Sequence, residues 1–277
     1  AAKEGYTNYI ASALVGACTT SSYDDMERVA DVARQAEAHG RKVKVPFLVT
    51  PGSEQIHRTI QRDGQMQAMM NSGATVLANA CGPCIGQWNR PAAANAGKNT
   101  IVTSYNRNFP KRNDGSANTL CFIGSPEIVM GYALSGKLDF DPTKDELTGA
   151  DGVTFHLQPP KAAPEVPAKG FVGDPSGYVA PPANKSVVVT VAPASERLQL
   201  LAPFPAWDGK EYTGMPVLLK ANGKCTTDHI SPAGTRLKFR CHLAHIRNNP
   251  FSVALHDPTS PPAPRHVQPP RTHNAAP

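Results

Sequence analysis

The chain has 277 residues, of which 40% are hydrophobic and 18% are charged, and its formal net charge is +6. These values are typical of a globular protein with one large or two ordinary domains, and they exclude a disordered or fibrous chain. No run of about eighteen apolar residues occurs, so we expect no membrane partner. The basic residues form no stripe with interleaved aromatic residues, so we expect no nucleic-acid partner.

The first predicted elements are a strand and a helix. Residues 11–17 form a short apolar run that predicts a buried strand. Ser22 and Asp25 have the spacing of a capping box, and apolar residues then recur at helical intervals until Gly40, which predicts a helix that ends there.

The alternation of strands and helices continues along the chain. We expect strands over residues 43–50, 74–80 and 100–104, and a helix over residues 53–71. This alternation predicts an α/β fold, in which a parallel sheet is flanked by helices.

The pattern changes after residue 158. Residues 159–184 contain seven prolines and predict a semi-rigid linker. Strands are expected over residues 186–191 and 216–220, as the start of a β-containing domain. The pattern is lost after Arg240. We therefore expect four parts, listed here by residue number: an α/β domain over 1–158, a linker over 159–184, a second domain over 185–240 and a disordered tail over 241–277.

Three cysteines carry the strongest chemical signal. Cys81 and Cys84 form a Cys-Gly-Pro-Cys motif, and Cys18 lies far upstream. Such a motif is found in redox dithiols and in zinc sites. A zinc site needs a fourth ligand, which Cys121, Cys225 or Cys241 could in principle supply. Three thiolates can also hold a four-iron cluster by three corners, which leaves one iron open to a substrate.

The predicted strands bring polar residues to one edge of the sheet. The residues that follow predicted strands are Cys18, Cys81, Cys84, Asn106 and Arg107. In open parallel sheets, ligand-binding groups gather in loops beyond the carboxyl ends of the strands. We therefore expect these side chains to converge.

Seven segments extend this signal over most of the chain. They are GACTTSSYDDM (16–26), TPGSEQI (50–56), ANACGPCIGQW (78–88), TSYNRNF (103–109), SPEIV (125–129), RLQLL (197–201) and GKCTTDHIS (223–231). In this order and at these intervals, the sequence resembles the aconitase family from about residue 3 to residue 240.

The resemblance implies a hydro-lyase that interconverts citrate and isocitrate through cis-aconitate. It implies a 4Fe-4S cluster on Cys18, Cys81 and Cys84, and an active-site acid, Asp228, as a catalytic residue. The tricarboxylate substrate carries a charge near −3 and needs fixed cations with paired donors. The residues implied to bind it are Asn106, Arg107, Arg112 and Arg240.

The resemblance further implies a fragment of a monomeric parent enzyme of the tricarboxylic acid cycle, located in the mitochondrial matrix or in the cytoplasm. Family members are about three times longer, so we expect the third domain, a linker and the start of the fourth. The family's catalytic serine belongs to a later part of the fourth domain, so we expect this chain alone to be inactive.

Two alternatives remain open at this point. Thr20 replaces an asparagine that is frequent in the family, which gives a reason to consider a homoaconitase-like enzyme that acts on a longer acid. The other alternative is an inert product whose cysteines are structural or redox-active.

Overall fold

A computed structural model describes residues 2–90, 97–161, 163–173, 175–184, 186–217 and 242. The chain divides into two units, with the boundary between residues 185 and 186. Within the described part of the chain, no helix is both long enough and apolar enough to cross a membrane.

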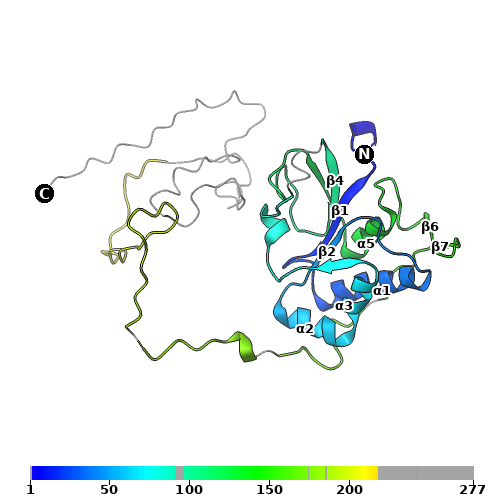
Figure 1. The fold of residues 1–277 in the computed structure, drawn as a ribbon. Helices are drawn as coiled ribbons and strands as arrows, with labels where there is room; N and C mark the ends of the chain where they lie inside the picture. Colours follow the sequence, from blue (N-terminus) through cyan, green and yellow to red (C-terminus); the bar gives the residue numbers. More distant parts are fainter. Residues whose placement is uncertain are drawn as a thin grey trace. The chain divides into compact units, whose positions relative to one another are not determined.

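The centre of the first unit is a five-stranded sheet, drawn in blue to green in Figure 1. Its strands are β1 (Ile10–Gly16), β2 (Phe47–Thr50), β3 (Ala74–Val76), β4 (Asn99–Thr103) and β5 (Thr119–Ile123). Every pairing is parallel, and the order across the sheet is β3-β2-β1-β4-β5. The predicted α/β fold with a parallel sheet is confirmed.

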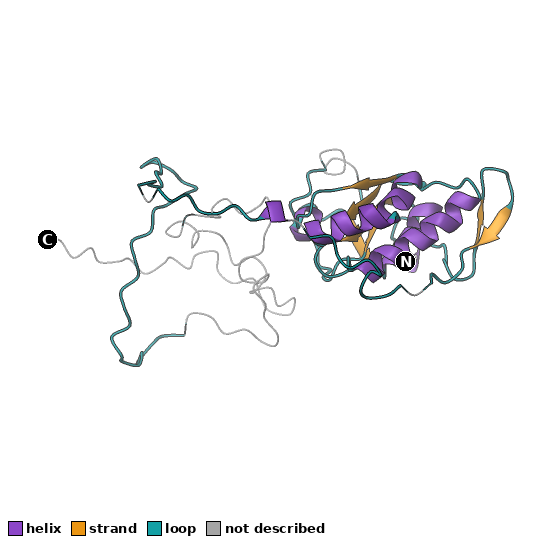
Figure 2. Cartoon of the chain, turned by 90° about the horizontal axis from the view of Figure 1, so that it is seen from below, coloured by secondary structure: helices purple, strands orange, loops and turns teal. Residues whose placement is uncertain are grey.

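Among the described residues, four α-helices pack in one layer against the sheet (Figure 2). They are α1 (Tyr23–Ala38), α2 (Glu54–Asp63), α3 (Gln65–Asn71) and α5 (Pro126–Ser135). Because side chains alternate along a strand, only one face of each strand meets these helices. Ala13 and Val15 of β1 belong to the core that contains the buried side chains of all four helices, whereas Leu14 belongs to a second apolar cluster.

The direction of the chain explains why the opposite face carries a loop. The connections β1-α1-β2 and β2-α2-α3-β3 advance toward one edge of the sheet, and the chain then returns from β3 to β4 on the other side of β1. Crossovers between parallel strands are almost always right-handed, so a reversal of direction moves the connection to the other face. There, Cys84, Ile85 and Trp88 pack with Leu14 and Ile101.

Helix α1 begins as the sequence predicts. The Ser22 hydroxyl accepts a hydrogen bond from the Asp25 backbone N–H at 3.1 Å, and the Asp25 carboxylate accepts one from the Ser22 N–H at 3.0 Å. The capping box is therefore confirmed. Gly40, just beyond the helix, has φ of +62°, a left-handed conformation that glycine adopts readily.

The cap of α1 can be tested by mutation. We expect Ser22→Ala to lower the free energy of unfolding by about 1 kcal/mol, because it leaves helix N–H groups without an acceptor. Ser125→Ala is the matched control, since Ser125 begins α5 but its side chain makes no capping hydrogen bond. Urea titrations of both variants would measure the difference, and equal losses would contradict this account.

Three element boundaries differ from prediction. The helix expected over residues 53–71 is two helices, because Gly64 adopts φ of +92° and separates α2 from α3. The strands expected over residues 43–50 and 74–80 are shorter, at Phe47–Thr50 and Ala74–Val76. The residues after β3 leave the sheet before they reach the Cys-Gly-Pro-Cys motif.

Some elements were not predicted from the sequence. They are β5, α5 and an antiparallel hairpin of β6 (Glu146–Thr148) and β7 (Thr154–His156). Leu147 and Phe155 of the hairpin are buried in the main core, so this hairpin is part of the domain.

The segment predicted as a linker is attached to the helices along its first half. The Ala163 N–H donates to Asp24 of α1 at 3.1 Å, and the Val172 N–H donates to Thr59 of α2 at 3.0 Å. Among the described residues of 159–184, the regular structure is one 3-10 turn, Pro175–Gly177. The division into a domain, a linker and a second domain stays a prediction.

The strand predicted over residues 186–191 is wrong. Val187, Val188 and Val189 are each at least 70% exposed and belong to no strand. A run of valines favours a strand only where another strand pairs with it and one face is covered. The strand predicted over 216–220 and the tail over 241–277 lie almost entirely outside the described residues.

Candidate functional site

The site lies where the chain reverses its direction across the sheet. Strands β1 and β4 are neighbours, but the chain leaves β1 toward β2 and leaves β4 toward β5. The loops beyond their carboxyl ends therefore diverge, and such switch points are where parallel α/β sheets bind ligands. Cys18 follows β1, whereas Asn106 and Arg107 follow β4.

The loop after β1 has an unusual backbone. Gly16 has φ of +112° and Ala17 has φ of +63°, which is uncommon for a residue with a side chain. The Ala17 N–H donates to the Thr50 carbonyl of β2 at 3.0 Å. These two residues turn the chain sharply, so that the exposed Cys18 lies at the end of the sheet.

Ser104 connects the loops that follow β1 and β4. Its hydroxyl accepts a hydrogen bond from the Gly16 N–H at 3.0 Å, and its carbonyl accepts one from the Thr20 hydroxyl at 2.6 Å. The Asn106 amide donates to the Thr19 hydroxyl at 3.1 Å. The positions of Cys18 and Asn106 are therefore coupled.

These contacts change the interpretation of Thr20. Its hydroxyl oxygen lies 2.6 Å from the Ser104 carbonyl and 3.1 Å from the Gly16 carbonyl, so its single proton lies between two acceptors and the side chain helps to hold the loop together. These contacts give the hydroxyl at position 20 a structural role, so Thr20 by itself does not favour a longer-acid substrate.

The Cys-Gly-Pro-Cys motif forms a short turn on the face opposite the helices. A 3-10 helix, η2 (Gly82–Ile85), begins after Cys81, and the Cys84 N–H donates to the Cys81 carbonyl at 2.7 Å. Cys81 is exposed, but Cys84 is only 6% exposed. The Cys84 side chain packs with Leu14, Ile101 and Tyr105.

The three cysteines share one electrostatic neighbourhood. Burial raises the pKa of the Cys84 thiol, Arg112 opposes this increase, and negative charge on Cys18 or Cys81 adds to it. Cys18 and Cys81 therefore both lie close enough to Cys84 to act on its thiol. All three are free thiols.

This arrangement fits some cofactors better than others. Among the residues that the structure describes, no three His, Cys, Asp or Glu side chains converge as the ligands of one metal ion do. A cubane cluster instead takes each thiolate at a separate corner. Three free thiols, of which Cys84 is buried among apolar side chains, are a donor set that fits a cluster.

Arg112 supplies positive charge near the Cys84 thiol, and Arg107 lies on the same loop. Arg112 is 9% exposed, and its Nη2 atom lies 3.9 Å from the Cys84 sulfur. Its guanidinium lies over the Phe109 ring, 5.2 Å from the ring centroid. Arg107 is exposed in the loop after β4. The structure thus provides one buried cation and one accessible cation on the same loop.

Cys121 is separate from this group. It lies on β5, where its sulfur is 3.7 Å from the Thr103 hydroxyl, and burial raises its pKa to about 11. Its side chain is half-buried. Asp228 and Arg240, predicted for the active site, lie outside the described residues, as do Cys225 and Cys241.

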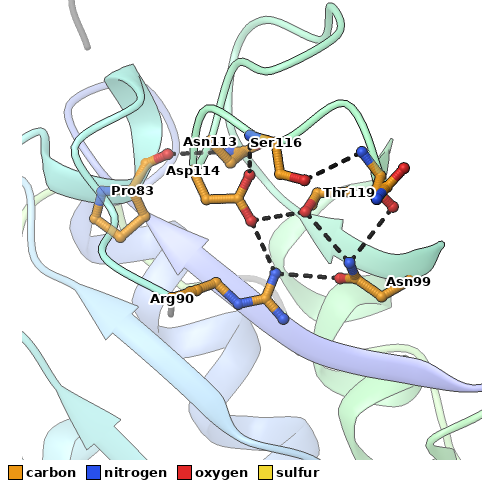
Figure 3. Close-up of polar contacts among 8 residues, drawn as sticks. Pro83, Arg90, Asn99, Asn113, Asp114, Ser116 and Thr119 are labelled. Carbon is orange, nitrogen blue, oxygen red and sulfur yellow. Dashed lines mark hydrogen bonds and ion pairs between the residues drawn. The ribbon is translucent and has the colours of Figure 1, made fainter. Parts of the chain in front are cut away.

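Four residues near the site were missed by sequence reasoning. They are Ser104, Asn113, Asp114 and Arg90 (the last three in Figure 3). Each acts on a backbone atom or on a partner far along the chain, and such contacts leave no regular spacing in the sequence. The only available signal was their position beside Tyr105, Arg112 and the cysteine motif.

Fold and site together define an α/β protein that gathers three thiols and a buried arginine at the carboxyl edge of a parallel sheet. Residues 2–136 match the aconitase family (aconitate hydratase). The chain is 52% identical over 258 residues to the mitochondrial aconitate hydratase of Gracilaria gracilis, covering 92% of this chain and 33% of that protein. We conclude that the chain belongs to the aconitase family.

Further relatives agree with this assignment. The mitochondrial aconitate hydratase of Saccharomyces cerevisiae is 54% identical over 237 residues, covering 85% of this chain and 30% of that protein. A probable mitochondrial aconitate hydratase of Caenorhabditis elegans is 51% identical over 255 residues, covering 92% of this chain and 32% of that protein. The chain spans about a third of the length of the curated relatives it matches.

Proposed function

We propose that this chain contributes the cluster-binding part of an aconitate hydratase, a hydro-lyase that interconverts citrate and isocitrate through cis-aconitate. The observation that carries the proposal is the gathering of Cys18, Cys81 and Cys84 beside Arg112, in a domain of the aconitase family.

The proposed cofactor is a 4Fe-4S cluster held by Cys18, Cys81 and Cys84. Such a cluster, when bound, supplies a Lewis-acidic iron that polarises a hydroxyl group without redox change. Cys84 lies among apolar side chains that keep water from its sulfur, and the Arg112 guanidinium favours its thiolate form. Cys18 and Cys81 are exposed, which leaves one side of the thiol group accessible.

The proposed substrate is a tricarboxylate. Arg112 and Arg107 offer fork-shaped donors that match carboxylates, and Asn106 offers an amide whose orientation Thr19 fixes. Arg240 is proposed as a further substrate-binding residue and Asp228 as an acidic catalytic residue, both by family resemblance. The proton-transferring base is not assigned to any residue of this chain.

The relatives quoted above are named as mitochondrial enzymes. We propose the mitochondrial matrix and the tricarboxylic acid cycle for this protein too. A monomeric parent enzyme stays a prediction.

The proposal can be tested with the full 277-residue chain. After anaerobic reconstitution with ferrous iron and sulfide, mild oxidation should produce the EPR signal of a three-iron cluster. We expect Cys18→Ser, Cys81→Ser and Cys84→Ser each to abolish this signal, because each removes one of three thiolate ligands. Cys121→Ser is the matched control and should retain it.

Two results would contradict the proposal. One is the absence of any three-iron signal in the unsubstituted chain under these conditions. The other is an undiminished signal in Cys84→Ser, since the cluster would then be held elsewhere.

A further inference from the structure

Three consecutive residues of the loop between β4 and β5 contact the segment that carries Cys81 and Cys84. Arg112 approaches the Cys84 sulfur, Asn113 bonds the Pro83 carbonyl, and Asp114 pairs with Arg90. Figure 3 shows the last two contacts side by side. The loop therefore holds the cysteine segment at its centre and at its far end.

Asn113 contacts the middle of the motif. Its side chain is 3% exposed, and its Nδ2 atom donates to the Pro83 carbonyl at 3.0 Å. The Asn113 carbonyl accepts a hydrogen bond from the Trp88 N–H at 3.4 Å. Because Pro83 lies between the two cysteines, this contact fixes the backbone directly before Cys84.

Arg90 and Asp114 form a buried ion pair with further partners. The two side chains are 14% and 3% exposed, and Nη1 lies 3.1 Å from Oδ2. The Asp114 carboxylate also accepts hydrogen bonds from the Thr119 hydroxyl at 2.6 Å and from the Ser116 N–H at 3.0 Å. Arg90 donates to Asn99 at 3.2 Å, and its guanidinium lies over Trp88 at 4.4 Å.

The cysteine segment needs such support because the sheet does not provide it. Strand β3 ends at Val76, and the regular structure between Leu77 and Arg90 is the four-residue η2. A short turn of this kind has little stability of its own. Its placement against Leu14 and Ile101 therefore depends on the loop contacts.

We propose that Asn113 and the Arg90–Asp114 pair are positioning residues that hold the Cys81–Cys84 segment in the geometry required for cluster binding. The purpose of this arrangement rests on the proposed function. The positioning role itself does not, because the contacts that carry it join residues of this chain.

The positioning role of Asn113 and of the Arg90–Asp114 pair is tested by measuring the reactivity of the Cys84 thiol. The measurement uses the full chain before any cluster is added. Cys84 is buried, so its alkylation by iodoacetamide requires the segment to open. Mass spectrometry reports the rate for each cysteine separately. We expect Asn113→Ala to raise the Cys84 rate by about tenfold, the factor that corresponds to the loss of one buried hydrogen bond. The Cys121 rate should not change.

Two further variants distinguish a specific effect on the cysteine segment from general misfolding. Asp114→Asn keeps the shape of the side chain but removes its charge, and it should also raise the Cys84 rate. Combining it with Arg90→Gln restores a neutral side-chain pair, and the double variant should react more slowly than Asp114→Asn. Ser72→Ala is the matched control, since Ser72 is 1% exposed and bonds Met69 within the helix layer. It should leave the Cys84 rate unchanged.

The cluster provides the second measurement. After reconstitution, Asn113→Ala and Asp114→Asn should lose the three-iron EPR signal several times faster than the unsubstituted chain during exposure to air. Ser72→Ala should behave as the unsubstituted chain.

The outcomes separate this inference from the proposed function. Unchanged Cys84 reactivity in both variants would overturn the positioning role, even if the cluster forms normally. Increased reactivity in a chain that never binds a cluster would support the positioning role and overturn the proposed function. An equal increase in Ser72→Ala would overturn the positioning role, because general destabilisation would then explain the effect.

Discussion

Replacing Gly16 by alanine is expected to lower the free energy of unfolding by about 2 to 6 kcal/mol. Gly16 has φ of +112°, a conformation that costs a residue with a side chain about 1 to 3 kcal/mol. A Cβ atom at this position would also overlap the Thr50 carbonyl of β2, and such overpacking costs about 1 to 3 kcal/mol. Chemical denaturation of the purified variant measures the sum.

Gly64 offers a control that separates the two contributions. It has φ of +92°, but a Cβ atom there would meet nothing within 4 Å. Gly64→Ala should therefore show only the conformational cost, about 1 to 3 kcal/mol. If the two variants lose equal stability, close approach to Thr50 is not what requires glycine at position 16.

The same substitution should affect the site, because Gly16 begins the turn that leads to Cys18. To accommodate a Cβ atom, the loop must move away from Thr50, and the hydrogen bond from the Gly16 N–H to Ser104 would lengthen. One of the contacts that hold the loops after β1 and β4 together would then be weakened. We expect the three-iron EPR signal of the reconstituted variant to weaken with its stability.

Local signals explain which elements could be predicted from the sequence. Helix α1 was found because its cap and its apolar spacing lie within a few residues of each other. The break between α2 and α3 was missed because a glycine within a helical pattern does not by itself reveal a positive φ. Strand β5 was missed because it has only five residues and its pairing with β4 is not visible in the local sequence.

The strand order required information that no local pattern contains. The apolar runs predict parallel strands, but the position of β1 between β2 and β4 depends on the long connections. Once that order is known, the handedness of crossovers explains why the cysteine motif lies on the face opposite α1, α2, α3 and α5. Residues 186–191 illustrate the opposite case, because a good strand sequence there has no pairing strand among the described residues.

The candidate site was predicted in part. The cysteine spacing alone left zinc, redox and cluster chemistry open, and only the resemblance to a family selected among them. The structure adds that Cys84 is buried beside Arg112 and that Cys18 and Cys81 influence it. The supporting residues Ser104, Asn113 and Asp114 could not be predicted, since they bond backbone groups of distant segments or, for Asp114, a distant arginine.

The arginine beside Cys84 should matter most for substrate binding. In the complete protein loaded with its cluster, we expect Arg112→Ala to weaken citrate binding by about a hundredfold, because it removes a charge-assisted and largely buried donor pair. Arg112→Lys should weaken citrate binding less than Arg112→Ala does. Lysine keeps the charge but cannot donate two parallel hydrogen bonds to a carboxylate. Isothermal titration calorimetry with citrate measures both effects.

Arg34→Ala is the matched control for this experiment. Arg34 also forms an ion pair, with Glu27 at 2.7 Å, but it lies on α1 in the helix layer. Its removal should leave citrate binding unchanged.

The EPR signal must be recorded for Arg112→Ala in parallel, because loss of the contact to Cys84 could also lower cluster occupancy. If Arg112→Ala retains both its cluster and its affinity for citrate, Arg112 serves the cysteine segment alone and the substrate must be bound by other residues.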